Sequence, residues 1–440
     1  MAVGSTPEEN LMPDRMLEVD GFIGVNQRAK EQNLIGPTLG QEVPGKLEGR
    51  VFKNIDITDR LSAETRPGYS LFLPLSGAHS GFTSGQKILC GCDQGLVLVD
   101  PRDKSYSVLR SGISPWAVIS YAKVGSRVFW TNGEVSGIVD GDSNSDWGID
   151  RPGIVSASAV SVGGLVAGKY QVTLTFLRNG EESGATIGTP VEVSAGGGIQ
   201  LTNIPQGGDS IRVYITRANQ DVFLKHSDLP LGTTDFLITD KNVSLPLETQ
   251  FSQRIPPGHI VRYFRGRMLV AAGKFLLLSM PLRYGLYRPS KDILPPFNDR
   301  IRIIQPVEDG FYVDDGSLHF VSFSKLDEAA NVNLLPEQFG AIEGSGISVP
   351  AFWFGLESRE PVAFWWTERG FPIVGAPSGQ IIPVGADKMA VPKYKAGTSF
   401  LREREGIRQI ITAFSNAAPV SGFAASDSLE ATVYKRGLSA

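Results

Sequence analysis

A strand-turn-strand unit recurs along this chain, and it constrains the fold more than any other feature of the sequence. Each copy joins two short apolar runs through a turn rich in Gly, Asp or Asn. The second copy contains Asn132-Gly133, a dipeptide typical of two-residue β-hairpins. Helical periodicity is nearly absent, so the sequence predicts an all-β protein. We identify six copies, at 87–100, 127–140, 267–279, 310–323, 362–374 and 422–434.

The spacing of these copies predicts a β-propeller of about six blades. The first two begin 40 residues apart, at Lys87 and Arg127, and the third and fourth begin 43 apart, at Arg267 and Gly310. One four-stranded propeller blade takes about 40–50 residues. The later intervals of 52 and about 60 residues are longer, as expected where loops have grown.

The interval between the second and third copies is 140 residues, which leaves room for one blade and an inserted domain. Short alternating strands with regular turns fill this interval, a pattern typical of a β-sandwich. The strand from Gly168 to Phe176 and the turn Arg178-Asn179-Gly180 resemble fibronectin type III and related immunoglobulin-like modules. We expect four parts: an extended N-terminal arm (1–60), a first propeller segment (61–150), a fibronectin-like insert (151–255) and a second propeller segment (256–440).

Composition and charge exclude several classes of protein. The two cysteines, Cys90 and Cys92, would share one face of a strand, so we interpret them as small buried hydrophobes and exclude a disulfide scaffold or a cysteine zinc site. The net charge is −4, without the basic surplus of a protein that binds DNA phosphates. The dense charge run 402–405 alternates in sign, which is typical of a solvated face.

Segments that would direct the chain to or across a membrane are not predicted. Residues 1–16 are polar and lack the apolar core of a signal peptide. No apolar run approaches the roughly 20 residues that a membrane-spanning helix needs. We therefore expect a chain made in the cytoplasm, with no membrane span.

One run of the sequence is similar to a phosphate-binding loop, and four histidines are possible metal ligands. The run 163–169 satisfies G-x-x-x-x-G-K, but Tyr170 stands where Ser or Thr must hold Mg²⁺. A strand follows instead of a helix, so the run is interpreted as a turn. The four histidines lack the spacing of metal ligands. They are His79, His226, His259 and His319.

Asp140–Asp146 places oxygen atoms at alternate positions, as a calcium loop does. The run lacks Gly at the sixth position, and Arg151 stands at the twelfth, where a bidentate Glu belongs. A polar connecting loop is favoured. The overlapping run 143–148 is distantly similar to the Asp-box of propeller sialidases, but it occurs once. The sequence thus predicts no catalytic, cofactor-binding or metal-binding residue, and no enzyme.

The first 150 residues resemble the opening of tail-nozzle and related propeller tail proteins of short-tailed bacteriophages. The matching runs are GFIGVNQR at 21–28, NIDI at 54–57, RPGY at 66–69 and WTNG at 130–133. The resemblance implies a non-enzymatic virion protein that assembles as a homo-oligomeric ring, usually a hexamer, around a channel for DNA ejection. It also implies neighbours such as an adaptor and tail fibers. An acidic chain suits a channel through which DNA passes without specific binding.

Two other functions are weighed against this hypothesis. A glycan-binding or glycan-cleaving receptor-recognition propeller would need aromatic and carboxylate side chains at its central mouth. Trp353, Trp365 and Trp366 are the candidates, but their strand context predicts core packing. A bacterial surface adhesion module is disfavoured because no signal peptide is predicted.

Overall fold

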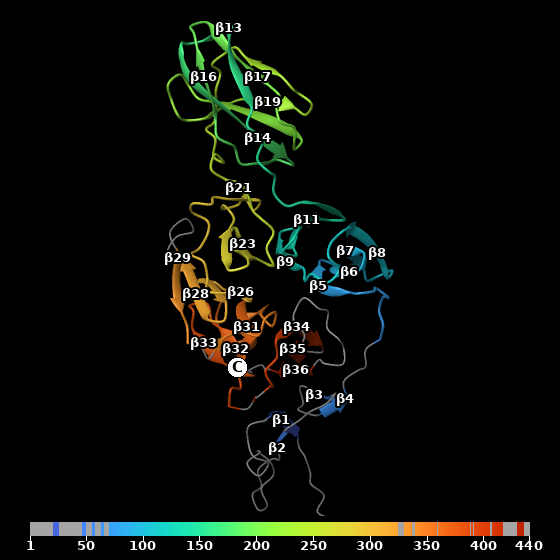
Figure 1. The fold of residues 1–440 in the computed structure, drawn as a ribbon. Helices are drawn as coiled ribbons and strands as arrows, with labels where there is room; N and C mark the ends of the chain where they lie inside the picture. The colour runs from blue at the N-terminus through green and yellow to red at the C-terminus, as the bar shows by residue number, and fades with distance from the viewer. Residues whose placement is uncertain are drawn as a thin grey trace, which may run out of the picture.

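Six antiparallel sheets form a ring, and a two-sheet body lies beside it (Figure 1). The computed structural model describes residues 21–25, 46–49, 55–57, 63–65, 70–323, 330–336, 339–358, 360–387, 389, 391–404, 407–416 and 429–434. Within these ranges the structure has no α-helix, and a short 3-10 turn spans Ala351–Phe354. The same ranges contain no helix long and apolar enough to cross a bilayer. The chain is all-β, as predicted.

Four sheets of the ring contain four strands each, and every strand pairs with its neighbours in sequence. The first two are β5 (His79–Ser84), β6 (Lys87–Cys92), β7 (Gly95–Asp100), β8 (Ser105–Arg110), and β9 (Ser120–Val124), β10 (Arg127–Thr131), β11 (Ser136–Asp140), β12 (Ser143–Asp146). The other two are β26 (Ile303–Pro306), β27 (Gly310–Asp314), β28 (Leu318–Phe323), β29 (Ala330–Leu334), and β30 (Ile347–Val349), β31 (Val362–Trp366), β32 (Pro372–Gly375), β33 (Ile381–Pro383).

The third and sixth sheets contain three strands each. They are β22 (Ile260–Phe264), β23 (Arg267–Ala272), β24 (Phe275–Leu278), and β34 (Ala396–Arg404), β35 (Ile407–Ser415), β36 (Leu429–Tyr434). In the third sheet the segment around Ile293 pairs with Leu277 and takes the place of a fourth strand. The pair β21 (Gln253–Arg254) and β25 (Leu286–Tyr287) lies next to it.

The first strands of successive sheets lie side by side, which makes the ring a β-propeller. β5 is beside β9, β9 beside β22, β22 beside β26, β26 beside β30, and β30 beside β34. Each sheet is therefore a blade whose first strand faces the centre of the ring (Figure 1). The prediction of a propeller of about six blades is confirmed.

An apolar layer fills the space between successive blades, which explains the apolar runs in the middle strands. Side chains of adjacent residues in a strand point to opposite faces. Phe129 accordingly packs between the second and third blades, while Trp130 packs between the first and second. Trp365 and Trp366 divide in the same way between the layers on either side of the fifth blade. A strand buried on both faces must be apolar throughout rather than alternating.

The first five predicted hairpins are the middle strand pairs of blades one to five. The sixth, at 422–434, is displaced. Its second run is β36, but β36 pairs with β35, and residues 422–428 lie outside the described part of the chain. The blade is built on the hairpin β34–β35. Charged residues occupy the end of β34, so this hairpin lacks the continuous apolar pattern of the others.

The insert is a β-sandwich placed between β12 and β22. One sheet contains β13 (Ser156–Leu165), β17 (Gly197–Thr202) and β20 (Phe236–Ile238). The other contains β14 (Gly168–Arg178), β15 (Glu181–Glu182), β16 (Thr189–Val193), β18 (Ser210–Ile215) and β19 (Leu224–Pro230). The pairing β13–β17 and the order β14-β18-β19 correspond to the B–E and C-F-G pairings of the immunoglobulin fold. The resemblance in sequence to such modules is thus borne out by topology.

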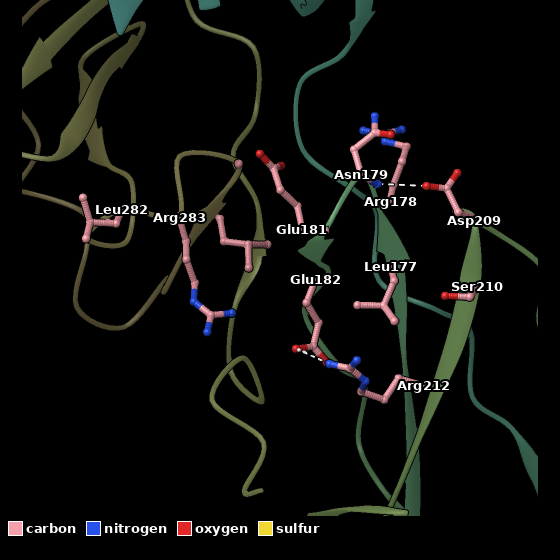
Figure 2. Close-up of a pocket in the computed structure, with 13 residues that line it drawn as sticks. Leu177, Arg178, Asn179, Glu181, Glu182, Asp209, Ser210, Arg212, Leu282 and Arg283 are labelled. Carbon is pink, nitrogen blue, oxygen red and sulfur yellow. Dashed lines mark hydrogen bonds and ion pairs between the residues drawn. The ribbon is translucent and has the colours of Figure 1, made fainter. Parts of the chain in front are cut away.

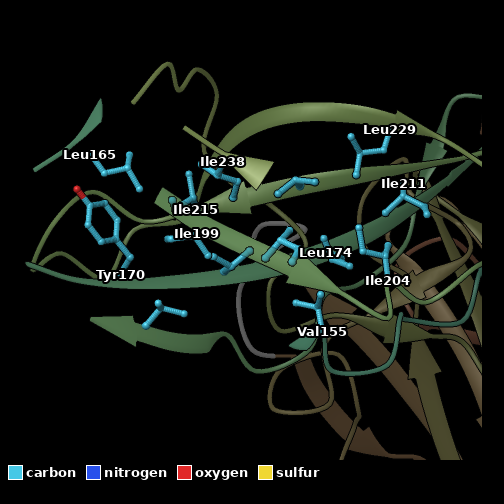
Figure 3. Close-up of a cluster of buried hydrophobic side chains, with 14 of the residues drawn as sticks. Val155, Leu165, Tyr170, Leu174, Ile199, Ile204, Ile211, Ile215, Leu229 and Ile238 are labelled. Carbon is cyan, nitrogen blue, oxygen red and sulfur yellow. The ribbon is translucent and has the colours of Figure 1, made fainter. Parts of the chain in front are cut away.

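The core of the sandwich is closed on itself (Figure 3). Tyr170, Val172 and Leu174 alternate along β14 and point into this core. The Tyr170 hydroxyl donates a hydrogen bond to the Val166 backbone oxygen, 3.0 Å away, so its polar end is satisfied at the edge of the core.

Most of the predicted N-terminal arm, 1–60, lies outside the described residues. Three of its short segments are described: β1 (Gly21–Val25) pairs in parallel with β2 (Lys46–Gly49), and β3 (Ile55–Ile57) pairs with β4 (Ala63–Thr65).

Candidate functional site

A groove of about 600 Å³ lies where the insert meets the ring (Figure 2). The insert supplies the turn between β14 and β15 and the beginning of β18, and the ring supplies the loop that precedes β25. Pockets between domains are common ligand sites, so the groove is the first candidate. Its polar lining consists of Arg178, Asn179, Glu181, Glu182, Asp209, Ser210, Arg212 and Arg283.

The charged groups on the walls of the groove are bound to other protein groups. Arg212 donates to Asp228 at 2.6 Å, and this hydrogen bond lowers the pKa of the Asp228 carboxyl. Glu182 accepts the Tyr214 hydroxyl at 2.7 Å, and burial raises the pKa of that phenol. Arg283 pairs with Glu248. Each of these charged side chains already has a protein partner, so none of them is left free to bind a ligand.

Two arginines instead join the insert to the ring beside the groove. Arg178 donates to the backbone oxygens of Asp146 at 2.8 Å and Gly148 at 2.6 Å. Arg254 lies in the segment that returns from the insert to the ring. It donates a hydrogen bond to the backbone oxygen of Trp147, which lies in the segment that leads from the ring to the insert. Both connections between the insert and the ring are therefore held by hydrogen bonds.

Close backbone contact completes the joint. Arg127 of β10 pairs with Glu181 of β15 at 3.1 Å, which links a blade directly to the insert. Gly148 and Gly285 pack so closely that a Cβ on Gly285 would lie 2.7 Å from the Gly148 Cα. Only glycine fits this approach.

The four histidines lie in four different places. His79 bonds Ser80, His226 lies beside Asp240 in the sandwich, His259 bonds the Ile301 backbone oxygen, and His319 bonds Asp315. Among the residues that the structure describes, no group of three or more His, Cys, Asp or Glu side chains could hold a metal.

The run 140–146 forms the β11–β12 hairpin, and its oxygen atoms diverge. Asp142 pairs with Lys87 at 2.6 Å and Asp146 pairs with Arg110 at 3.1 Å. Asn144 accepts the indole N–H of Trp130 at 2.8 Å. The hairpin is thus a polar connection, as favoured from the sequence.

Two further sequence interpretations are borne out. The run 163–169 contains the end of β13, the turn at 166–167 and the start of β14, so a strand and not a helix follows the turn. Cys90 and Cys92 are buried and free, and burial raises the pKa of the Cys90 thiol to about 11.

The three tryptophans considered for glycan binding belong to the core. Trp365 is fully buried and donates its indole N–H to the Phe339 backbone oxygen at 3.0 Å. Trp366 donates to the Thr412 hydroxyl at 2.9 Å, and Trp353 is 7% exposed. None of them lines a sugar-sized surface.

The joint was missed by sequence reasoning. Arg178 stands in a predicted turn, and Arg254 stands two residues before the Pro-Pro run near the end of the insert, but nothing in either pattern indicates a partner. The buried ion pair of Arg267 with Asp292, 3.1 Å apart, was also missed, because its partners lie 25 residues apart in the chain.

No protein-family model and no curated protein matches this sequence. Solved structures with similarity to the chain include the N-terminal domain of Nup159, with 11% identity, a TM-score of 0.32 and coverage of 81% of this chain and 76% of that chain. BamB from Moraxella catarrhalis has 11% identity and a TM-score of 0.32, with coverage of 83% and 85%. BBS1N, solved in complex with ARL6DN, has 9% identity and a TM-score of 0.33, with coverage of 84% and 94%. Similarity this low carries no argument about function. The class that the sheets define is a six-bladed propeller carrying an immunoglobulin-like insert.

Proposed function

We propose that this protein is a non-enzymatic structural component of a bacteriophage tail, the nozzle or hub ring that extends the tail channel for genome ejection. The support from sequence is the set of short runs between residues 21 and 133 that resemble tail-nozzle proteins. The support from structure is a propeller whose insert is joined to the ring by hydrogen bonds on both connections. On this proposal the chain forms a homo-oligomeric ring, a hexamer, in contact with an adaptor and tail fibers.

The observation that carries the proposal is the joint between insert and ring. Arg127, Arg178 and Arg254 join the two bodies through hydrogen bonds to side chains and backbone on both connections. A particle component must present its surfaces to several neighbours in fixed relative positions. A ring with a rigidly held outer domain meets this requirement, whereas a hinged ligand trap would keep its domain interface open.

Net charge is compatible with a conduit. One chain carries −4, so six chains carry 6 × −4 = −24. DNA binds proteins chiefly through phosphate contacts with Lys and Arg, and a net negative ring would not retain the passing duplex.

Assembly and location test this proposal. The full chain is expected to form a closed ring, measurable as the mass of a hexamer by light scattering and as a ring in negative-stain electron micrographs. In purified phage particles, antibody labelling of the insert should mark the tail. A chain that stays monomeric at high concentration and never enters a particle would overturn the proposal. Trp353, Trp365 and Trp366, the candidates for a glycan-binding propeller, are buried, so they give no support to that alternative.

A further inference from the structure

Arg262 is a cation on the inner ring of the propeller. It is the third residue of β22, the strand of the third blade that lies beside the first strands of the second and fourth blades. Its side chain is half-buried. A charged group at this position would ordinarily be paired with an acid.

One nitrogen of Arg262, Nη1, is held by hydrogen bonds where the second and third blades meet. Nη1 donates to the Ser120 hydroxyl oxygen at 3.0 Å and to the Val261 backbone oxygen at 2.8 Å. The Ser120 oxygen also accepts the Val261 backbone N–H at 3.0 Å, which fixes the hydroxyl in turn. Both protons of Nη1 are thereby used, and the plane of the guanidinium is held.

No carboxylate in the described part of the chain forms an ion pair with Arg262. The contrast with other arginines of the ring is clear: Arg267 pairs with Asp292 at 3.1 Å, and Arg302 pairs with Glu368 at 2.6 Å. Because no acid compensates for its burial, the pKa of the Arg262 guanidinium falls to about 10. A partly desolvated cation with neutral partners only is unfavourable for the folded state.

We propose that Arg262 anchors an oxyanion-binding site on the inner ring, which takes one carboxylate or phosphate group. An arginine has five N–H donors in a planar fork, and two of them belong to Nη1. The free edge consists of Nε and Nη2, whose parallel N–H bonds match the two oxygens of a carboxylate or phosphate. Ser120 orients this edge without competing for it. The site stands on its own and does not depend on the proposed tail function.

Thermal unfolding of the full chain tests the site with two probes, sodium phosphate and sodium acetate, each against sodium chloride at equal ionic strength. Binding to the folded state alone raises the melting temperature, by about 2 °C at ten times the dissociation constant. We expect phosphate or acetate to raise the Tm of the natural protein. A response to acetate alone identifies a carboxylate ligand, and a response to phosphate alone identifies a phosphate.

Two variants locate the effect. Arg262→Met should abolish the rise while leaving the Tm in chloride equal to or above that of the natural protein, because an unpaired charge is removed. Arg265→Met, three residues further on and paired with Asp309 across the next blade, should keep the rise. If Arg262→Met fails to fold, Ser120→Ala serves instead. It keeps the charge but removes one of the two hydrogen bonds of Nη1, and titration calorimetry should then show weaker binding.

The proposal is overturned if neither probe raises the Tm of the natural protein, or if Arg262→Met responds as fully as Arg265→Met does.

Discussion

Arg254 donates its Nε proton to the backbone oxygen of Trp147 at 2.9 Å, although the two residues are 107 positions apart in the chain. Trp147 follows the last strand before the insert, and Arg254 belongs to the strand that returns from it. A second nitrogen of Arg254 bonds Asp150 at 2.9 Å. The two connections of the insert are therefore tied to each other at the surface of the ring.

Arg254→Met should loosen the insert, because it removes both of these hydrogen bonds. We expect a loss of about 1–3 kcal/mol in the free energy of unfolding. Limited proteolysis should show faster cleavage in 147–155 and 250–257. Arg265→Met is the control, since Arg265 and its exposed partner Asp309 both belong to the ring, and the cleavage rate of this variant should match that of the natural protein. Equal cleavage in the Arg254 variant would show that the joint does not depend on this residue.

Gly285→Ala should separate the ring from the insert by steric pressure. The new Cβ would lie 2.7 Å from the Gly148 Cα, and backbone cannot move aside as a flexible side chain does. A cost of about 1–3 kcal/mol is expected, measured by denaturant unfolding. Gly81→Ala is the matched control, with no atom within 4 Å of the new Cβ and an expected change within about 0.5 kcal/mol. Similar values for both variants would refute the close contact.

The Asp228 carboxyl should make the insert sensitive to acid. Its pKa is lowered by the hydrogen bond from Arg212, so its contribution is present above the unfolded pKa of about 3.9 and is lost as the pH falls through the folded value. The side chain is 40% exposed, and solvent screening limits the contribution to about 0.5–1 kcal/mol. Asp228→Asn should therefore lower the Tm at pH 7 and leave it unchanged near pH 2. A difference of equal size at both values would contradict the assignment.

Cys90 should resist thiol reagents in the folded protein. Burial raises the pKa of its thiol to about 11, so the reactive thiolate is scarce at pH 8. Cys92 is also buried, with 2% of its surface exposed. We expect no reaction with a disulfide-exchange reagent in buffer and two equivalents in denaturant. Rapid labelling of the native chain would show that the first blade opens.

Sequence reasoning found the middle hairpins of five blades because these strands are buried on both faces and must be apolar throughout. The Asn132-Gly133 turn joins β10 to β11 as predicted. The outer strands carried no such signal: β8 is mostly exposed, and it contains both polar and apolar residues. The sixth blade was misplaced because β34 and β35 carry charges toward their shared turn.

The joint and the Arg262 seam could not be predicted for another reason. Arg254 with Trp147 and Arg262 with Ser120 each lie on opposite sides of the insert in sequence, which separates the partners by more than 100 residues. A lone arginine in a sequence has the same appearance whether its partner is water, a carbonyl or a ligand. Burial and distance decide among these, and only the folded chain supplies them.

Phe129 and Trp130 are neighbours in one strand, yet they fill different seams of the ring. Blades two to five are in this sense wedges, each shared by the two blades on either side, and a substitution in one of their middle hairpins should loosen both neighbours. The sandwich has its own interior and shares none of these seams. Sequence change is therefore absorbed more easily in the sandwich and in the outer loops than in the wedges, so surfaces that meet different partners can diverge while the ring keeps its geometry.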